Sequence, residues 1–168
     1  DEIYRRALDA MAPRYGLDKL DEASLHHINH VWHRLLPWPD VVDGLTRLKK
    51  NYLISTLSNG DVAMLANMAK HGGLPWDTVL CGQVFRHFKP DPEIYLGAIE
   101  LLGCQPHEVM MVAAHNDDLK HARSHGMRTG FVLRPTEYGP AQQTNLQAAE
   151  QWDVIASDFG ELATALGA

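Results

Sequence analysis

The stretch VMMVAAHNDD, residues 109–118, decides how the rest of the sequence is organised. Residues 109–114 are all apolar, and such a run is typical of a strand buried on both faces of a parallel sheet. The run ends at consecutive polar residues, and parallel sheets bind ligands beyond the carboxyl ends of their strands. The stretch therefore predicts a buried parallel strand that delivers residues 115–118 to a ligand site.

On both sides of this stretch, from residue 39 onward, helical and strand patterns alternate, as they do in a parallel sheet covered by helices. Further strands are expected over 52–57, 78–81, 129–133 and 154–156. Helices are expected over 41–50, 61–71, 92–102, 119–125 and 160–166, and 134–151 is expected to be mostly loop. The predicted fold class is α/β, a Rossmann-like parallel sheet with helices on both faces.

The first part of the chain, residues 1–38, shows only helical patterns. Apolar residues recur at three- and four-residue steps over 1–15, and Gly16 is placed as a C-cap. A second helical pattern over 22–36 stops at the breaker Pro37-Trp38-Pro39. The chain is therefore predicted to consist of a small helical region, 1–38, and an α/β core, 39–168.

Composition excludes several classes of partner. The 168 residues are 45% hydrophobic, enough for one sizeable core, and the net charge of -6 offers no basic surface for nucleic acid. Cys81 and Cys104 lack the density and spacing of a secreted scaffold or metal motif, which indicates reduced thiols and a cytoplasmic protein. We expect no membrane association, because there is no signal-peptide pattern and no apolar run long enough to span a bilayer.

Polar motifs follow three of the predicted elements. They are Leu57-Ser58-Asn59-Gly60, then Lys89-Pro90-Asp91-Pro92-x-x-Tyr95, then Val112-Ala113-Ala114-His115-Asn116-x-Asp118. In this order and spacing the motifs, and essentially the whole chain, resemble the haloacid dehalogenase-like hydrolases, closest to the type II (L-2-haloacid) dehalogenases. Helical region 1–38 then resembles part of that family's cap.

The resemblance implies a hydrolase in which an aspartate carboxylate attacks the substrate and water cleaves the resulting ester. Lys89 matches the lysine that keeps this carboxylate ionised and holds substrate charge, and Asp118 matches the carboxylate that orients the lysine. Ser58 and Asn59 match the position that binds the substrate's anionic group. Each also has an ordinary structural interpretation, as a turn lysine, a helix-start acid or a helix cap.

The same resemblance implies a small anionic substrate, a 2-haloacid, and no cofactor. Tyr95, His115 and Asn116 are expected to contact it, together with Trp32 at the junction of helical region and core. A tryptophan at such a junction is more often a core or hinge residue than part of a substrate wall. Whether the chain forms a homodimer stays open.

Two departures from the family pattern keep an alternative open. The family has Ser-x-Asn where this chain has Ala113 and His115, and commonly an aromatic residue where it has Asp117. Adjacent Asp117 and Asp118 suggest a Mg²⁺ site, as in the phosphatase relatives. The histidines at 26, 30 and 33 share helical spacing, but no carboxylate or cysteine accompanies them, which favours a solvated or pocket-lining face.

The family's nucleophile motif, Asp-x-x-Gly-Thr after an apolar strand, has no counterpart in this chain. We therefore assign the nucleophile to no residue and expect the central strand of the sheet to be missing. The chain alone is predicted to be inactive. A function of another class, a non-catalytic remnant or a module for association, is the remaining alternative.

Overall fold

The first part of the structure is helical, as predicted. In a computed structural model that describes residues 2–168, helix α1 (Glu2–Met11) runs into the 3-10 turns η1 (Ala12–Tyr15) and η2 (Leu17–Lys19). Helix α2 (Glu22–Asn29) continues as the 3-10 helix η3 (His30–Arg34). Gly16, with φ of 68°, ends the first helical stretch as predicted. The expected start of that helix, Asp1, lies outside the described residues.

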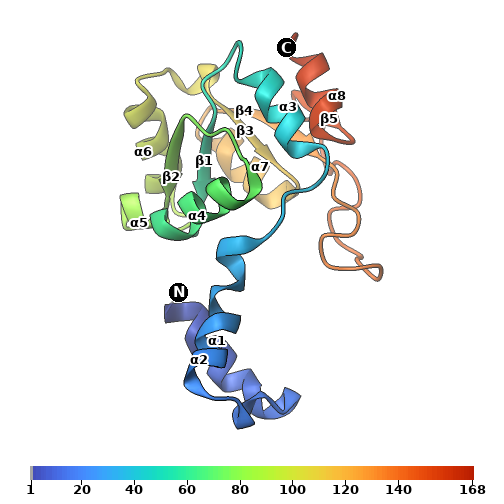
Figure 1. Ribbon diagram of the computed structural model, residues 1–168. Coiled ribbons are helices and arrows are strands. Elements are labelled where there is room, and N and C mark those ends of the chain that lie inside the picture. Colours follow the sequence, from blue (N-terminus) through green and yellow to red (C-terminus); the bar gives the residue numbers. More distant parts are fainter. Residues whose placement is uncertain (1) are drawn as a thin grey trace.

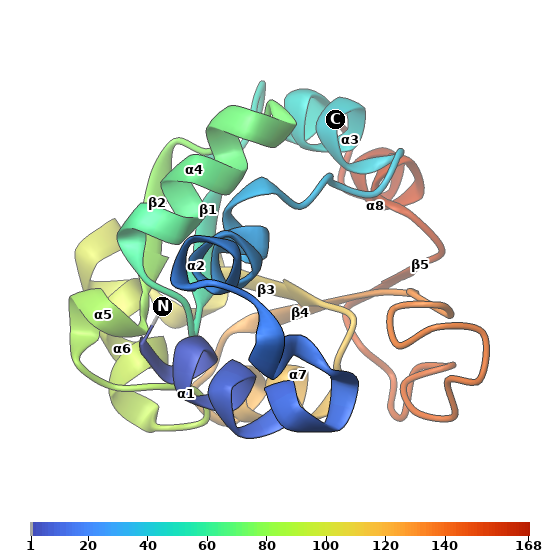
Figure 2. The same cartoon turned by 60° about the horizontal axis from the view of Figure 1, so that its bottom comes forward.

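The second part alternates helices and strands. Its helices are α3 (Val41–Leu48), α4 (Val62–Gly72), α5 (Gly82–Phe85), α6 (Pro92–Leu102), the 3-10 turn η4 (Pro106–Glu108), α7 (Asn116–Ser124) and α8 (Phe159–Ala165). Its strands are β1 (Ser55–Ser58), β2 (Thr78–Cys81), β3 (Met110–Ala113), β4 (Arg128–Val132) and β5 (Val154–Ala156). Figure 1 shows the helical region below this α/β part, and Figure 2 shows it centred over that part rather than beside it. Among residues 2–168, every helix is too short or too polar to cross a membrane.

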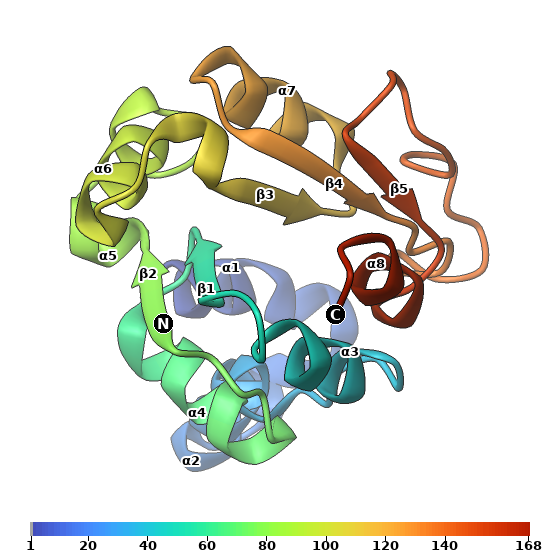
Figure 3. The same cartoon turned by 90° about the horizontal axis from the view of Figure 1, so that it is seen from above.

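The strands form two separate parallel sheets. Strand β1 pairs with β2, while β4 lies between β3 and β5. Within the described residues β1 and β3 do not pair, so each keeps one edge outside the sheet hydrogen bonding. Figure 3 shows α7 on one face of the β3–β4–β5 sheet and α8, with α3 beside it, on the other. The prediction of an α/β fold with helices on both faces is confirmed.

Two apolar clusters enclose the larger sheet. One joins α6 and α7 to the sheet and includes the fully buried Tyr95 and Leu119 and the nearly buried Phe131. The other joins α3 and α8 to the opposite face and includes Leu45 and Leu162. Burying side chains of this size stabilises the fold by roughly 1.5–3 kcal/mol each. Both faces of the sheet are therefore anchored by helices.

A cavity of about 740 Å³ lies between the two sheets. All four residues of β1 line it on one side, and residues 109–112 line it on the other. Ser58 and Lys89 lie on its wall as well. The open edges of β1 and β3 therefore face a shared space rather than packed side chains.

Carboxylate caps explain where three helices begin. The side chains of Asp21, Asp61 and Asp158 each accept a hydrogen bond from the backbone N–H three residues later, at 2.9, 2.8 and 2.7 Å. Such a bond satisfies a donor that the first helical turn leaves unpaired, and the negative charge suits the helix N-terminus.

The structure corrects several expected boundaries. Strand β1 begins at Ser55 rather than Tyr52, because the Tyr52 hydroxyl donates to Leu166 O and the Ile54 N–H donates to the Asp77 carboxylate. Helix α7 begins at Asn116 rather than at residue 119, and helix α5 was not expected. The second predicted helix is α-helical only to residue 29.

One ion pair ties the start of the core to its end. Arg134, 9% exposed, donates to both carboxylate oxygens of Asp40 at 3.1 and 2.7 Å, and the Phe159 N–H donates to the same carboxylate at 2.8 Å. The guanidinium also lies over the ring of Trp38, 5.1 Å from its centroid. Burial works to raise the pKa of Asp40, but these hydrogen bonds outweigh it and lower the pKa below its ordinary value.

We predict that Arg134→Ala lowers the free energy of unfolding by about 2–4 kcal/mol, because it leaves a partly buried carboxylate without its cation. Arg6→Ala, which removes an exposed pair with Glu2, should change it by less than about 0.5 kcal/mol. Since the folded-state pKa of Asp40 is lowered, the pair stabilises the protein above the ordinary aspartate pKa and loses this effect as pH falls. Urea unfolding at neutral and acidic pH checks this, and equal losses for both variants would contradict it.

Candidate active site

A chain of two hydrogen bonds connects Lys89, Asp118 and Tyr95. The Lys89 ammonium donates to one oxygen of the Asp118 carboxylate at 2.5 Å, and the Tyr95 hydroxyl donates to the other at 2.8 Å. Lys89 lies in the turn before α6, Tyr95 in the first turns of α6 and Asp118 in the first turn of α7. Their side chains thus meet where the turn approaches the carboxyl end of β3.

The surroundings of this chain hold it in one arrangement. Tyr95 is fully buried, while the side chains of Lys89 and Asp118 are 21% and 12% exposed. Burial raises the pKa of the Tyr95 hydroxyl, and the neighbouring Asp118 carboxylate raises it further. Tyr95 therefore stays a neutral donor. Because both Asp118 oxygens have a donor, the carboxylate is held in position for the lysine.

Asn59 fixes the backbone of the lysine turn. Its side-chain oxygen accepts a hydrogen bond from the Lys89 N–H at 2.6 Å, and its side-chain amide donates to the Lys89 carbonyl at 3.1 Å. Ser58, one residue earlier, accepts from the Gly60 N–H through its hydroxyl at 3.1 Å. The turn after β1 is thus joined directly to Lys89. The sequence motif indicated a site role for Asn59 but not this contact.

His115 has two partners that the sequence did not indicate. Its Nε2 atom lies 3.0 and 3.1 Å from the carboxylate oxygens of Glu137 and 3.1 Å from the hydroxyl of Tyr138, whose ring stacks on the imidazole. Both partners belong to the loop after β4. The sequence did hold one signal for these partners, since both residues follow the strand that pairs with β3. Neighbouring parallel strands end at the same edge of a sheet, so residues that follow them lie close together.

Asn116 holds the same loop. Its side-chain amide donates to Asn145 Oδ1 and to the Gln147 carbonyl, both at 3.0 Å. Its side-chain oxygen accepts from the Ala149 N–H at 2.8 Å and from the Trp152 indole at 3.0 Å. Asn116 is also buried, so the structure places it as an anchor of the 134–151 segment rather than beside an open ligand space.

Asp117 and Asp118 point to different surroundings although they are adjacent. The side chain of Asp117 is 90% exposed and lies 3.6 Å from the Lys120 ammonium, whereas Asp118 faces Lys89 and Tyr95. Successive helical residues are turned by about 100° around the axis, which separates the two carboxylates. Within residues 2–168, neither belongs to a group of three or more His, Cys, Asp or Glu side chains whose ligand atoms lie within 4.8 Å of one another.

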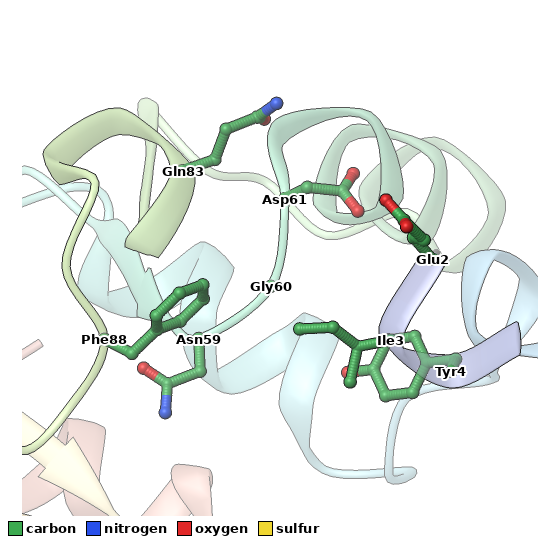
Figure 4. Close-up of a pocket in the computed structure, with 8 residues that line it drawn as sticks. All are labelled: Glu2, Ile3, Tyr4, Asn59, Gly60, Asp61, Gln83 and Phe88. Atoms are coloured by element: carbon green, nitrogen blue, oxygen red, sulfur yellow. The ribbon is translucent and has the colours of Figure 1, made fainter. Parts of the chain in front are cut away.

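A second cavity, about 620 Å³, lies between the helical region and the core. Figure 4 shows Ile3 and Tyr4 of α1 on one side and Asn59 and Phe88 of the core on the other. Trp32 is not among the lining residues; its ring stacks on Tyr4 with centroids 5.1 Å apart. Trp32 therefore supports the wall of this cavity from behind, and Asn59 connects the cavity to the lysine turn.

The family model of the haloacid dehalogenase-like hydrolases matches residues 3–126. The chain belongs to this family. The matched region includes Ser58, Asn59, Lys89, Tyr95 and Asp118, and the family resemblance read from the three motifs is thereby confirmed.

Several of the relatives and solved structures that the chain resembles are named dehalogenases. (S)-2-haloacid dehalogenase 4A of Burkholderia cepacia is 31% identical over 140 residues, covering 79% of this chain and 61% of the relative. This chain thus spans less than two thirds of that protein's length. Among solved structures, the L-2-haloacid dehalogenase PA0810 superposes with a TM-score of 0.94 at 51% identity, covering 97% of this chain and 70% of that one. The defluorinating L-2-haloacid dehalogenase Rha0230 has a TM-score of 0.94 at 42% identity, with 98% and 68% coverage.

We predict that Tyr95→Phe lowers the free energy of unfolding by about 1–2 kcal/mol, because it leaves an oxygen of the partly buried Asp118 without its donor. Tyr15→Phe is the matched control, since Tyr15 is 60% exposed. Urea denaturation of both variants checks this. The same midpoint for parent and Tyr95→Phe would show that the hydroxyl does not hold Asp118.

Proposed function

We propose that this chain contributes the lysine, its orienting carboxylate and the anion-binding turn to a 2-haloacid dehalogenase. The observation that carries the proposal is the Lys89–Asp118–Tyr95 hydrogen-bond chain, joined to the β1 turn through Asn59. The relatives' names indicate a small (S)-2-haloacid as substrate. The reaction displaces halide from C2 with a carboxylate, and water then cleaves the ester to give a 2-hydroxy acid.

In this proposal Lys89 supplies the positive charge of the site. Its ammonium keeps the attacking carboxylate ionised and attracts the substrate anion, while Asp118 holds it in place. The backbone N–H groups and side chains of Ser58 and Asn59 bind the substrate carboxylate at the carboxyl end of β1. Because the hydrogen bonds already hold Lys89 and the turn after β1 in place, these groups need little rearrangement when substrate binds.

We place the nucleophilic aspartate on a strand that fills the cavity between β1 and β3. That cavity is lined by both open strand edges and reaches Ser58 and Lys89, so an aspartate at the carboxyl end of an inserted strand meets the lysine. A parallel strand there would satisfy the edge hydrogen bonds of both sheets. No residue of the 168 is assigned as nucleophile.

We assign activation of the hydrolytic water to His115. In this proposal Nε2 donates to Glu137, 3.0 Å away, so that Nδ1 is the nitrogen that accepts the proton of water. The family pattern, with Asn at this position, offers no such base. The residue previously expected only to contact substrate thus gains a chemical role, and Asn116 is left out of the proposed contacts.

The helical region also has a role in this proposal. We propose that residues 1–38 act as a partial cap, with the cavity between α1 and the β1 turn as the route to the site.

We propose no cofactor. The Mg²⁺-dependent phosphatase alternative needs Asp117 and Asp118 on one ion, and Asp117 faces solvent instead. If the chain is instead a non-catalytic module, no activity should depend on the site residues.

We expect the 168-residue chain alone to release no halide from chloroacetate or 2-chloropropionate, because it lacks the group that forms the ester. A chimaera that joins to it the part of the PA0810 dehalogenase outside the matched region should release halide. Replacing the aspartate of the added strand by alanine is the control. Halide release by the chain alone, or a folded chimaera without activity, would count against the dehalogenase proposal.

In the active chimaera, Lys89→Ala should lower kcat/KM by at least about 100-fold, on the order of 3 kcal/mol in transition-state stabilisation. Asp118→Asn should also impair turnover strongly, whereas Asp117→Asn should stay near the parent rate and EDTA should have no effect. Halide release and hydrolysis of p-nitrophenyl phosphate are measured side by side. Loss of activity in both aspartate variants together with EDTA sensitivity would establish the phosphatase alternative.

A further inference from the structure

A group of potential metal ligands lies outside the site described above. Nδ1 of His87, a carboxylate oxygen of Asp91 and one of Glu93 all lie within 4.8 Å of one another. His87 and Asp91 flank Lys89 in the turn between α5 and α6, and Glu93 is in the first turn of α6. In residues 2–168 this is the only group of three or more such ligands.

The donor atoms form one hydrogen bond, between His87 and Asp91, and their spacing also suits coordination of one ion. His87 Nδ1 is 3.3 Å from Asp91 Oδ2 and 3.7 Å from Glu93 Oε2, and the second distance is too long for a hydrogen bond. Zinc–nitrogen and zinc–oxygen bonds of about 2.0–2.2 Å in a tetrahedron place neighbouring ligand atoms roughly 3.3–3.6 Å apart. The two separations from His87 are therefore close to those around a shared ion, and the carboxylate oxygens of Asp91 and Glu93 lie within 4.8 Å of each other.

Charge and helix capping support the same conclusion. No lysine or arginine in the described part of the chain forms an ion pair with Asp91 or Glu93, whose ionic partner is His87 alone. Asp91 occupies the N-cap position of α6, yet its side chain accepts no capping hydrogen bond and is turned toward His87 instead. Two carboxylates and one imidazole thus converge with no lysine or arginine ion pair among the described residues.

The backbone of this turn already holds the ligands in place. The Asp91 N–H donates to the Phe88 carbonyl at 2.8 Å. Asn59 binds both the N–H and the carbonyl of Lys89. A metal ion therefore needs only side-chain adjustment, since the chain between the ligands is fixed. The three side chains are 42–55% exposed, which gives an ion direct access from solvent.

We propose that His87, Asp91 and Glu93 form a binding site for a divalent transition-metal ion, with Zn²⁺ as its representative. Nitrogen and carboxylate oxygen donors suit this class of ion, and three protein ligands leave one coordination position for water. The site is independent of the Asp117 and Asp118 carboxylates. Its ligands lie on both sides of Lys89, so a bound ion closes the lysine turn into a ring.

Isothermal titration of metal-free chain with zinc chloride tests the proposal. His87→Ala should weaken binding at one site at least tenfold, and the double variant Asp91→Asn, Glu93→Gln should do the same. The matched controls His121→Ala and Glu100→Gln, an exposed histidine and an exposed acid of α6, should bind as the parent does. Circular dichroism confirms that the variants stay folded, which their exposed positions favour.

The results that overturn the proposal are equally specific. A parent chain that binds no zinc overturns it, as does binding that is unchanged in His87→Ala and in the double variant. Binding that survives His87→Ala but disappears in His30→Ala would assign the ion to the stacked histidines of the helical region. Amide hydrogen exchange gives a second readout, because zinc should slow exchange over residues 87–93 in the parent and not in His87→Ala.

Discussion

A buried tyrosine holds the ionic partner of Lys89 in place. Tyr95 is packed in the core cluster of α6 and α7, and its hydroxyl aims Asp118 at the lysine. An exposed lysine–aspartate pair contributes little because both side chains move, but here one Asp118 oxygen is held by the hydroxyl of a tyrosine packed in the core. Core packing is thus transmitted to the reacting end of the sheet through two hydrogen bonds.

A second system of contacts places the loop of residues 134–151 against the same edge. Arg134 joins its beginning to Asp40, and Asn116 binds its later part through four hydrogen bonds. Between these anchors the loop presents Glu137 and Tyr138 to His115. A segment without regular secondary structure is thereby held at both ends, and its Glu137 carboxylate lies against Nε2 of His115.

The sequence predicted regular elements well where local signals were strong and poorly where distant contacts decide. Strand 78–81 and helix 92–102 were predicted at the observed bounds, because an apolar run and an N-terminal proline mark them locally. Strand β1 starts late because Asp77 takes the Ile54 N–H, a contact that no local pattern indicates. The motifs singled out Lys89 and Asp118, and the structure places their side chains in contact. The partners of His115 lie 22 and 23 residues away in an irregular loop, beyond the reach of periodicity.

The split between the two sheets bears on how strongly the proposed strand would be held. In the proposed placement, one strand in the cavity pairs with both β1 and β3. A strand that pairs with one edge is already positioned beside the other, so the second pairing occurs at a local concentration in roughly the millimolar range when a short linker restrains it. Covalent attachment raises occupancy in the same way. A detached peptide has no such advantage, and it competes with the tendency of open strand edges to pair with each other in neighbouring molecules.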